Sequence, residues 1–198
     1  MIQAQCVAAP EGAEDKSPSE PGAGREYSAV SIALSNTPYA AMILLGTAVL
    51  ALAPFPWAGV AAGAYVAYGL FGCLWIILSL CPYCPSYGRR SCPCGYGALA
   101  AKLRPQGDDS LFQQRFRKRI PPIVPLWILP VIIGGVAMVV AFSWLPALLM
   151  LAFVVDAFAV LPLLSKTHGC KHCPQREVCP WVNDRSVQEP GATCRSGD

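Results

Sequence analysis

Charged side chains are scarce in this chain of 198 residues: Asp, Glu, Lys and Arg make up only 14% of it, while 54% is hydrophobic. Soluble globular domains carry about a quarter charged residues, so this composition excludes an ordinary soluble domain. The first 30 residues also lack a basic start followed by an apolar run, and we expect no secretory signal. Their richness in Pro, Gly and Glu predicts a disordered lead.

Charge is almost absent from four apolar stretches. They cover Thr37 to Ala53, Ala58 to Leu80, Ile123 to Ser143 and Ala147 to Leu164. A helix of roughly 20 apolar residues crosses a bilayer, so we expect an all-α integral membrane protein with four transmembrane helices. The glycines of the second stretch, Gly59, Gly63, Gly69 and Gly72, favour close packing inside the bundle, with homodimerisation as the alternative.

The distribution of basic residues predicts the orientation. All 15 Lys and Arg residues lie outside the connections 54–57 and 144–146, so the helices form two hairpins with the termini and the central loop on one side. By the positive-inside rule that side is cytoplasmic. We therefore expect a multi-pass protein of the cell membrane, with Trp57 and Trp144 at the opposite interface.

The same reasoning divides the chain into seven segments. They are a lead (1–36), a first hairpin (37–80), a first cysteine cluster (81–97), a basic linker (98–122), a second hairpin (123–164), a second cysteine cluster (165–182) and a disordered tail (183–198). Each half is a hairpin followed by Cys-x-x-Cys-Pro, a spacer and Cys-Pro, which allows a pseudo-twofold repeat about the membrane normal.

Two groups of cysteines carry the chemistry of this sequence. The first group is Cys81, Cys84, Cys92 and Cys94; the second is Cys170, Cys173 and Cys179. Proline follows five of these seven cysteines, and it turns the chain sharply so that a thiolate can face a shared centre. Structural disulfides rarely persist in the cytoplasm, so we interpret both groups as metal-binding clusters.

The spacing leaves the metal and the ligand sets open. Cys-Pro is typical of iron–sulfur ligands, whereas paired Cys-x-x-Cys motifs also occur in zinc knuckles. His168 is a candidate fourth ligand of the second group, with His172 and Cys194 as alternatives. One centre in each half, or one centre shared between the halves, fits the spacing equally well. Cys73 is interpreted as a small apolar residue of its helix.

Asp156 is the only charged residue in the four stretches. A carboxylate inside a membrane helix costs about 2.5–3.5 kcal/mol on insertion scales, so its side chain should face the bundle interior or water. One hypothesis is a proton relay or a quinone contact. The other is a structural carboxylic acid hydrogen-bonded to Tyr65, Tyr68 or Thr47.

The basic linker predicts a short amphipathic helix on the inner leaflet. Ser110 to Gln113 fits a capping box, apolar residues follow at Phe112 and Phe116, and Pro121-Pro122 ends the helix. Basic residues fill most of the remaining positions, and contact with anionic lipid accounts for them. We expect no nucleic-acid binding.

In arrangement only, the chain resembles the four-helix membrane quinol dehydrogenases of the polyferredoxin type. Cys81 and Cys84 with Gly88, and Cys170 with Cys173, lie where the Cys-Pro motifs of those proteins fall. The spacing differs and ferredoxin runs are absent, so no residue role is carried over.

The main functional expectation is an iron–sulfur electron carrier between a cytoplasmic redox protein and a membrane quinone or larger complex. No nucleotide or flavin motif is recognisable, which favours an electron-transfer subunit over a self-sufficient enzyme. The alternatives are a zinc-stabilised, non-catalytic membrane adaptor and, less favoured, a thiol–disulfide oxidoreductase.

Overall fold

A computed structural model describes residues 26–169, and all regular structure within this range is helical, with no strand. The long helices are α1 (Ala29–Ala51), α2 (Ala58–Ser79), α5 (Pro125–Val140) and α6 (Trp144–Val155). The short ones are α3 (Tyr96–Leu103), α4 (Phe112–Arg119) and α7 (Leu161–Leu164). A π-helical turn, Asp156–Val160, joins α6 to α7, and a second π turn, Ser165–Gly169, follows α7.

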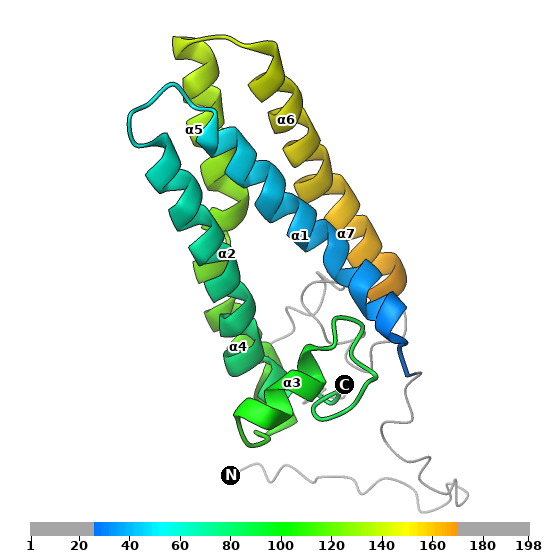
Figure 1. The fold of residues 1–198 in the computed structure, drawn as a ribbon. Coiled ribbons are helices and arrows are strands. Elements are labelled where there is room, and N and C mark those ends of the chain that lie inside the picture. Colours follow the sequence, from blue (N-terminus) through cyan, green and yellow to red (C-terminus); the bar gives the residue numbers. More distant parts are fainter. Residues whose placement is uncertain (1–25, 170–198) are drawn as a thin grey trace, which may run out of the picture.

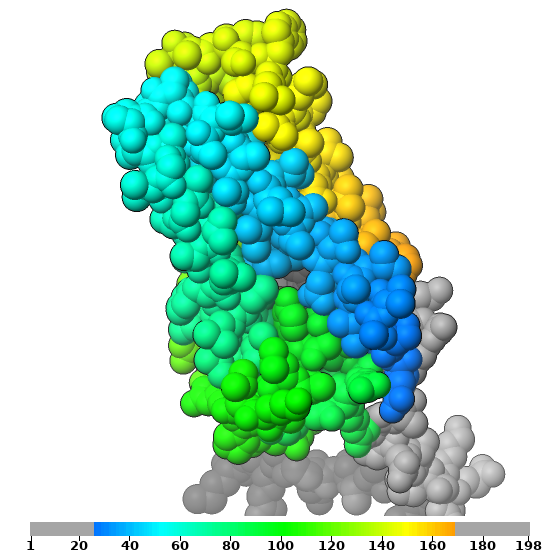
Figure 2. Space-filling view, viewed as in Figure 1, coloured from blue at the N-terminus to red at the C-terminus, as the bar shows by residue number. Residues whose placement is uncertain are grey.

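The short helices and the connections between the long helices lie at opposite ends of the bundle. Helices α3 and α4 lie at one end, with the start of α1 and the end of α7, whereas the connections 52–57 and 141–143 lie at the other end (Figure 1). The space-filling view shows the segment before and within α3 packed beneath α1 and α2 (Figure 2). We call the end that carries α3 and α4 the cysteine end, because Cys81, Cys84, Cys92 and Cys94 lie there.

The apolar surface of the bundle points outward. Four helical segments are long and apolar enough to cross a membrane: Ala29–Ala51, Ala58–Tyr83, Pro121–Val140 and Trp144–His168. Only 11–33% of the residues in their most apolar windows are buried, so most of this apolar surface is not covered by protein. Val139, for example, is 88% exposed. Such a surface is typical of a protein in a lipid bilayer.

Helix α1 begins at Ala29, earlier than the expected Thr37. The Ser28 hydroxyl accepts a hydrogen bond from the backbone N–H of Ser31 (3.3 Å) and caps the helix. The polar side chains of Ser35, Asn36 and Thr37 donate to carbonyls one turn earlier, at 2.8–3.0 Å. The side-chain hydrogen bonds of these polar residues are made within the helix. Because the first turns of α1 include these residues, the apolar run alone could not predict where the helix begins. The last long helix likewise begins at Trp144 rather than Ala147.

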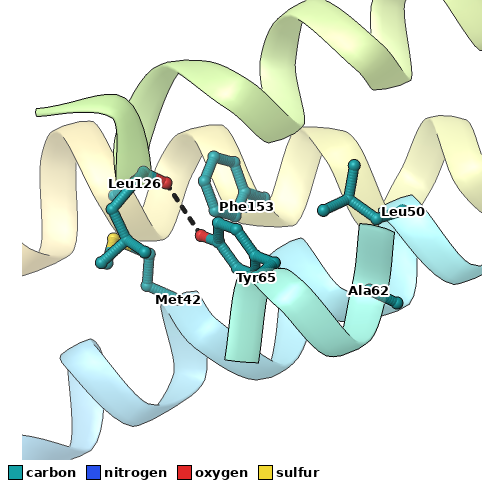
Figure 3. Close-up of a cluster of buried hydrophobic side chains, with 7 residues drawn as sticks. Met42, Leu50, Ala62, Tyr65, Leu126 and Phe153 are labelled. Atoms are coloured by element: carbon teal, nitrogen blue, oxygen red, sulfur yellow. Dashed lines mark hydrogen bonds between the residues drawn. The ribbon is translucent and has the colours of Figure 1, made fainter. Parts of the chain in front are cut away.

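The central core lies where the four long helices meet. Its buried members come from α1, α2, α5, α6 and the π turn: Met42, Leu50, Ala62, Tyr65, Leu126, Phe153 and Ala157 (Figure 3). Gly46 of α1 lies against the ring of Tyr65, and a Cβ at this glycine would come within 2.6 Å of the ring. The absence of a side chain at Gly46 is therefore what lets Tyr65 cross from α2 towards α5.

Hydrogen bonds from tyrosines on α2 hold the start of α5. The Tyr65 hydroxyl donates to the Leu126 carbonyl (2.8 Å, Figure 3), and the Tyr68 hydroxyl donates to the Pro122 carbonyl. Pro130, inside α5, has no N–H to give to the Leu126 carbonyl four residues earlier. Tyr65 supplies the donor that Pro130 removes, so the proline is tolerated within an apolar helix.

The two pairs of glycines on α2 have different surroundings. Gly69 and Gly72 are buried and pack against α1, with Ile43 and Tyr39 as close neighbours. Gly59 and Gly63 are exposed, and a Cβ added at either would meet nothing within 4 Å. Packing inside the bundle is therefore confirmed for Gly69 and Gly72 but not for Gly59 and Gly63, because the inward face at the start of this helix is set by Ala58, Ala62 and Tyr65.

The expected short amphipathic helix is present as α4, but its cap differs. The Asp108 carboxylate accepts a hydrogen bond from the Ser110 backbone N–H at 3.0 Å and caps the 3₁₀ turn Asp109–Leu111 before α4, and α4 itself begins without a side-chain cap. Hydrogen bonding from the Ser110 side chain, together with the bond from its backbone N–H, lowers the pKa of the Asp108 carboxyl. On the helix itself, Arg115 lies over the ring of Tyr83 (4.7 Å) and Arg119 over the ring of Trp75 (5.2 Å).

These two arginines attach α4 to the cysteine end of α2. Trp75 strengthens the contact, because its indole N–H donates to the Arg119 carbonyl at 2.9 Å. Arg117 and Lys118 are exposed on the other face of α4. Two of the four basic residues thus have a packing role that the expectation of lipid contact alone did not include.

Candidate metal centre

The first cysteine group begins where α2 ends. Cys81 to Tyr83 form a 3₁₀ turn directly after α2, and the backbone N–H of Cys84 donates to the Cys81 carbonyl at 3.2 Å. Pro82 is tolerated here because the first turn of a helix needs no N–H at that position. Cys81 is buried against Ile77 and Ala100, so the Cys-Pro-x-Cys turn rests on both α2 and α3.

A series of tight turns folds the segment from Cys84 to Cys94 back on itself. Backbone N–H groups of Tyr87 and Gly95 donate to the carbonyls of Cys84 and Cys92, at 2.9 and 3.0 Å. Gly95 has φ of 74°, in the left-handed region that favours glycine, and precedes the first residue of α3. The cysteines of this group thus occur at turn positions rather than in a helix.

Gly97 brings the start of α3 close to the loop. A Cβ at Gly97 would lie 2.3 Å from the Ser86 carbonyl oxygen and 3.4 Å from the Cβ of Cys92. The Gly97 carbonyl also accepts a hydrogen bond from the Gly88 N–H at 3.1 Å. No other residue fits at Gly97 without moving the segment that carries the cysteines.

Helix α1 holds the outer side of the same loop. The Asn36 amide donates both to the Ile32 carbonyl (2.8 Å) and to the Cys94 carbonyl (3.1 Å). The backbone N–H of Tyr27 donates to the Arg90 carbonyl at 3.0 Å. The sequence analysis did not identify Asn36, because it assigned residues 1–36 to a disordered lead. The signal that could have identified Asn36 is its amide side chain within a largely apolar helix.

The loop places the other three thiols of the group near Cys81. Cys84, Cys92 and Cys94 each lie close enough to Cys81 to interact with it electrostatically. Within residues 26–169, however, no three side chains of His, Cys, Asp or Glu are arranged to hold a metal ion. The structure therefore gathers these cysteines in one region without a ligand set, and the metal site remains a prediction.

Cys73 has a polar environment that its sequence position did not indicate. Its sulfur lies 3.4 Å from the hydroxyl of Tyr96, the first residue of α3, and it also interacts with the hydroxyl of Tyr39. Burial raises the pKa of Tyr96, and the bond to Cys73 raises it further. Tyr39 donates to the Gly69 carbonyl at 2.9 Å. These side chains link α1, α2 and α3 beside the first cysteine group.

Part of the predicted second centre lies outside the described residues: Cys170, Cys173, Cys179, His172 and Cys194. His168 is described, and it is exposed in the π turn Ser165–Gly169 that follows α7. Its ring Nδ1 lies 3.2 Å from the Thr167 hydroxyl, and its backbone carbonyl accepts a hydrogen bond from the Tyr27 hydroxyl at 3.3 Å. His168 is thus at the cysteine end of the bundle, near the start of α1.

Asp156 opens the first π turn, near the middle of the segment Trp144–His168. Its Oδ2 atom is buried and has no hydrogen-bond partner within the part of the chain that the structure describes. The hydroxyls proposed as partners donate elsewhere: Tyr65 to Leu126, Tyr68 to Pro122 and Thr47 to Ile43. None of these three hydroxyls bonds to Oδ2 in the structure, and the hypothesis of a structural carboxylic acid, which concerns the protonated group, stays a prediction.

A cavity of about 270 Å³ lies at the opposite end of the bundle. Its lining is largely apolar and includes Val49, Met138 and Phe142. It is formed by the connections 52–57 and 141–143 and the helix ends beside them, so it does not adjoin the cysteine group.

Comparisons of the chain with protein-family models, with curated proteins and with solved structures give no match. The functional argument therefore depends on the residues and their arrangement alone.

Proposed function

We propose that this chain is a multi-pass membrane metal-binding protein that serves as an iron–sulfur electron carrier. The observation that carries the proposal is the cysteine loop: four thiols between the end of α2 and the start of α3, at one end of an apolar four-helix bundle. Soft thiolate donors of this number select iron–sulfur clusters, zinc or Cu(I). The surroundings of the loop support a built site, since α1, α2 and α3 all hold it.

The orientation belongs to the proposal. The described Lys and Arg residues lie in or beside the cysteine end, from Arg89 to Arg119 and at Lys166, and the connections at the other end have none. The positive-inside rule therefore favours two hairpins with the cysteine end and both termini in the cytoplasm. In this orientation the thiols face a reducing compartment, which favours metal ligation over disulfides.

The ligands of the first centre would be Cys81, Cys84, Cys92 and Cys94, and such a group supplies reversible one-electron chemistry when bound. The chain's own contribution is to position the thiols beside the lipid phase. The Cys-Pro pairs remove the amide donors at Pro82, Pro85 and Pro93 and fix the backbone φ angle beside each of these cysteines.

The second centre would draw on Cys170, Cys173 and Cys179, with His168 as fourth ligand. Its support in the structure is the position of His168, whose carbonyl accepts a hydrogen bond from the Tyr27 hydroxyl, while the Tyr27 N–H donates to Arg90 in the first cysteine loop. A pseudo-twofold relation between the halves would place both centres below the same face of the membrane. We expect a cytoplasmic redox protein to deliver or accept electrons there, with a membrane quinone or a larger complex as the other partner.

Metal and acid-labile sulfide analysis, with an absorption spectrum, tests the proposal on protein purified anaerobically in mild detergent. We expect iron and sulfide together with a broad visible band. Cys84→Ser should lower the iron content, whereas Cys6→Ser, which removes a cysteine outside both groups, should leave it unchanged. Bound zinc without sulfide or a visible band would contradict the electron-carrier function and favour the alternative, a zinc-stabilised adaptor. Protein that binds neither metal would overturn both.

A further inference from the structure

Asp156 is the only acidic residue within the four candidate membrane segments. It lies 12 positions from each end of the segment Trp144–His168, so it is as far from either membrane surface as that helix allows. Its neighbours Phe153 and Ala157 are both buried in the central apolar cluster. The carboxyl group is thus held in the part of the bundle that is least able to solvate a charge.

Within residues 26–169, no group around Asp156 compensates a negative charge. The π turn packs against α1, α6 and α7. Helices α6 and α7 contain no other ionisable residue, and α1 contains only Tyr39, whose hydroxyl already donates to the Gly69 carbonyl. From α2, the nearby Tyr65 donates to the Leu126 carbonyl. An ionised carboxylate here would have neither a cation nor a donor for its buried Oδ2.

The backbone at Asp156 is also irregular. The Leu161 N–H donates to the Asp156 carbonyl, five residues earlier, instead of closing an α-helical bond. Pro162 follows and has no N–H, so it cannot restore the regular pattern of bonds over this turn. π turns inside membrane and soluble helices occur frequently at functional sites. This turn places the one intramembrane carboxyl at its first residue.

A metal cation does not fit this position. Hard cations require several oxygen ligands, and within residues 26–169 no three side chains of His, Cys, Asp or Glu form a group that could hold a metal. A proton needs only one oxygen, and it removes the charge that the surroundings cannot compensate.

We propose that Asp156 is a proton-binding site in the middle of the membrane bundle, occupied by a proton at neutral pH. An exposed aspartate has a pKa of about 3.9 and is ionised at neutral pH, so occupancy there distinguishes this carboxyl from the exposed ones. The proposal does not rest on the metal centre, since it uses only the surroundings of the π turn. Reversible release of the proton requires water or a base to reach Oδ2, which a change in packing between α1 and the π turn would permit.

Infrared spectroscopy of the full chain in lipid vesicles tests this directly. The carbonyl stretch of a protonated carboxylic acid should be present at neutral pH, shift in deuterated water, and be lost in Asp156→Asn. The matched control is Asp109→Asn, which removes an exposed carboxylate and should leave the band unchanged.

A wild-type spectrum without this band at neutral pH would overturn the proposal. A band that persists in Asp156→Asn would do the same, because another carboxyl would then carry the proton. If Asp156→Asn does not fold, Asp156→Glu keeps the acid and should move the band without abolishing it. An unmoved band would then count against the assignment. Each outcome is independent of the metal content of the protein.

Discussion

The hydrogen bond from Tyr65 to the Leu126 carbonyl should contribute measurably to stability, because Pro130 has no N–H that could donate to the same carbonyl. Tyr65→Phe removes one oxygen and keeps the ring in the central core, so packing is preserved. The Leu126 carbonyl then loses its donor, and both Leu126 and Pro130 are fully buried, so water cannot replace it. Hydrogen bonds between membrane helices contribute on average about 0.6 kcal/mol and at most about 1.7 kcal/mol.

We expect Tyr65→Phe to cost about 1–2 kcal/mol, at the upper end of that range, because a buried carbonyl without any donor costs about 1–3 kcal/mol. The test is a double-mutant cycle. Pro130→Ala introduces a backbone N–H four residues after Leu126, which can supply the missing bond. Tyr65→Phe should therefore cost clearly less in the Pro130→Ala background, with a coupling free energy of about 1 kcal/mol.

The assay is reversible unfolding in mixed micelles, with the free energy of unfolding compared among the four proteins. Tyr68→Phe is the matched control: its hydroxyl donates to the Pro122 carbonyl, so its effect should be the same with proline or alanine at position 130. An equal cost of Tyr65→Phe in both backgrounds would show that the proline and the tyrosine are not coupled, and it would refute this account of α5.

Two further predictions concern glycines and the cysteine loop. Gly97→Ala should displace the loop, because its new Cβ would lie 2.3 Å from the Ser86 carbonyl oxygen; faster labelling of the thiols of the first group checks this. Gly63→Ala serves as its control and should change neither labelling nor stability, since its Cβ would be in open space. Asn36→Leu removes the donor to the Cys94 carbonyl and should likewise speed labelling of Cys94, while α1 stays helical by circular dichroism. Unchanged labelling in Gly97→Ala or Asn36→Leu would contradict the assigned contacts.

The sequence predicted the long apolar helices because length and lack of charge are local properties. The helices α2 and α5 lie within one to three residues of the ends expected from their apolar runs. The start of α1 was not predictable in this way. Ser35, Asn36 and Thr37 look like loop residues, but their side chains bond back to the helix backbone.

Cysteine spacing predicted which residues could act together, and the structure brings four of them to one end of the bundle. It could not predict the partners that hold them, because Asn36 and Cys94 are 58 positions apart and meet only after α1 and the loop have packed. The same holds for Asp156. Whether its carboxyl has a hydrogen-bond partner depends on which carbonyls the hydroxyls of Tyr65 and Thr47 donate to, and no local sequence pattern predicts that.

The position of α1 has a consequence for the order in which the protein is assembled. Helix α1 packs against α2, α5, α6 and the π turn, so within residues 26–169 its neighbours come from all of the later long helices. The face of α1 that packs against α6 has no protein partner until α6, which ends at Val155, has been synthesised. Asp156 directly follows α6 in the chain, so its carboxyl reaches its protein surroundings only once α1 and α6 are both in place.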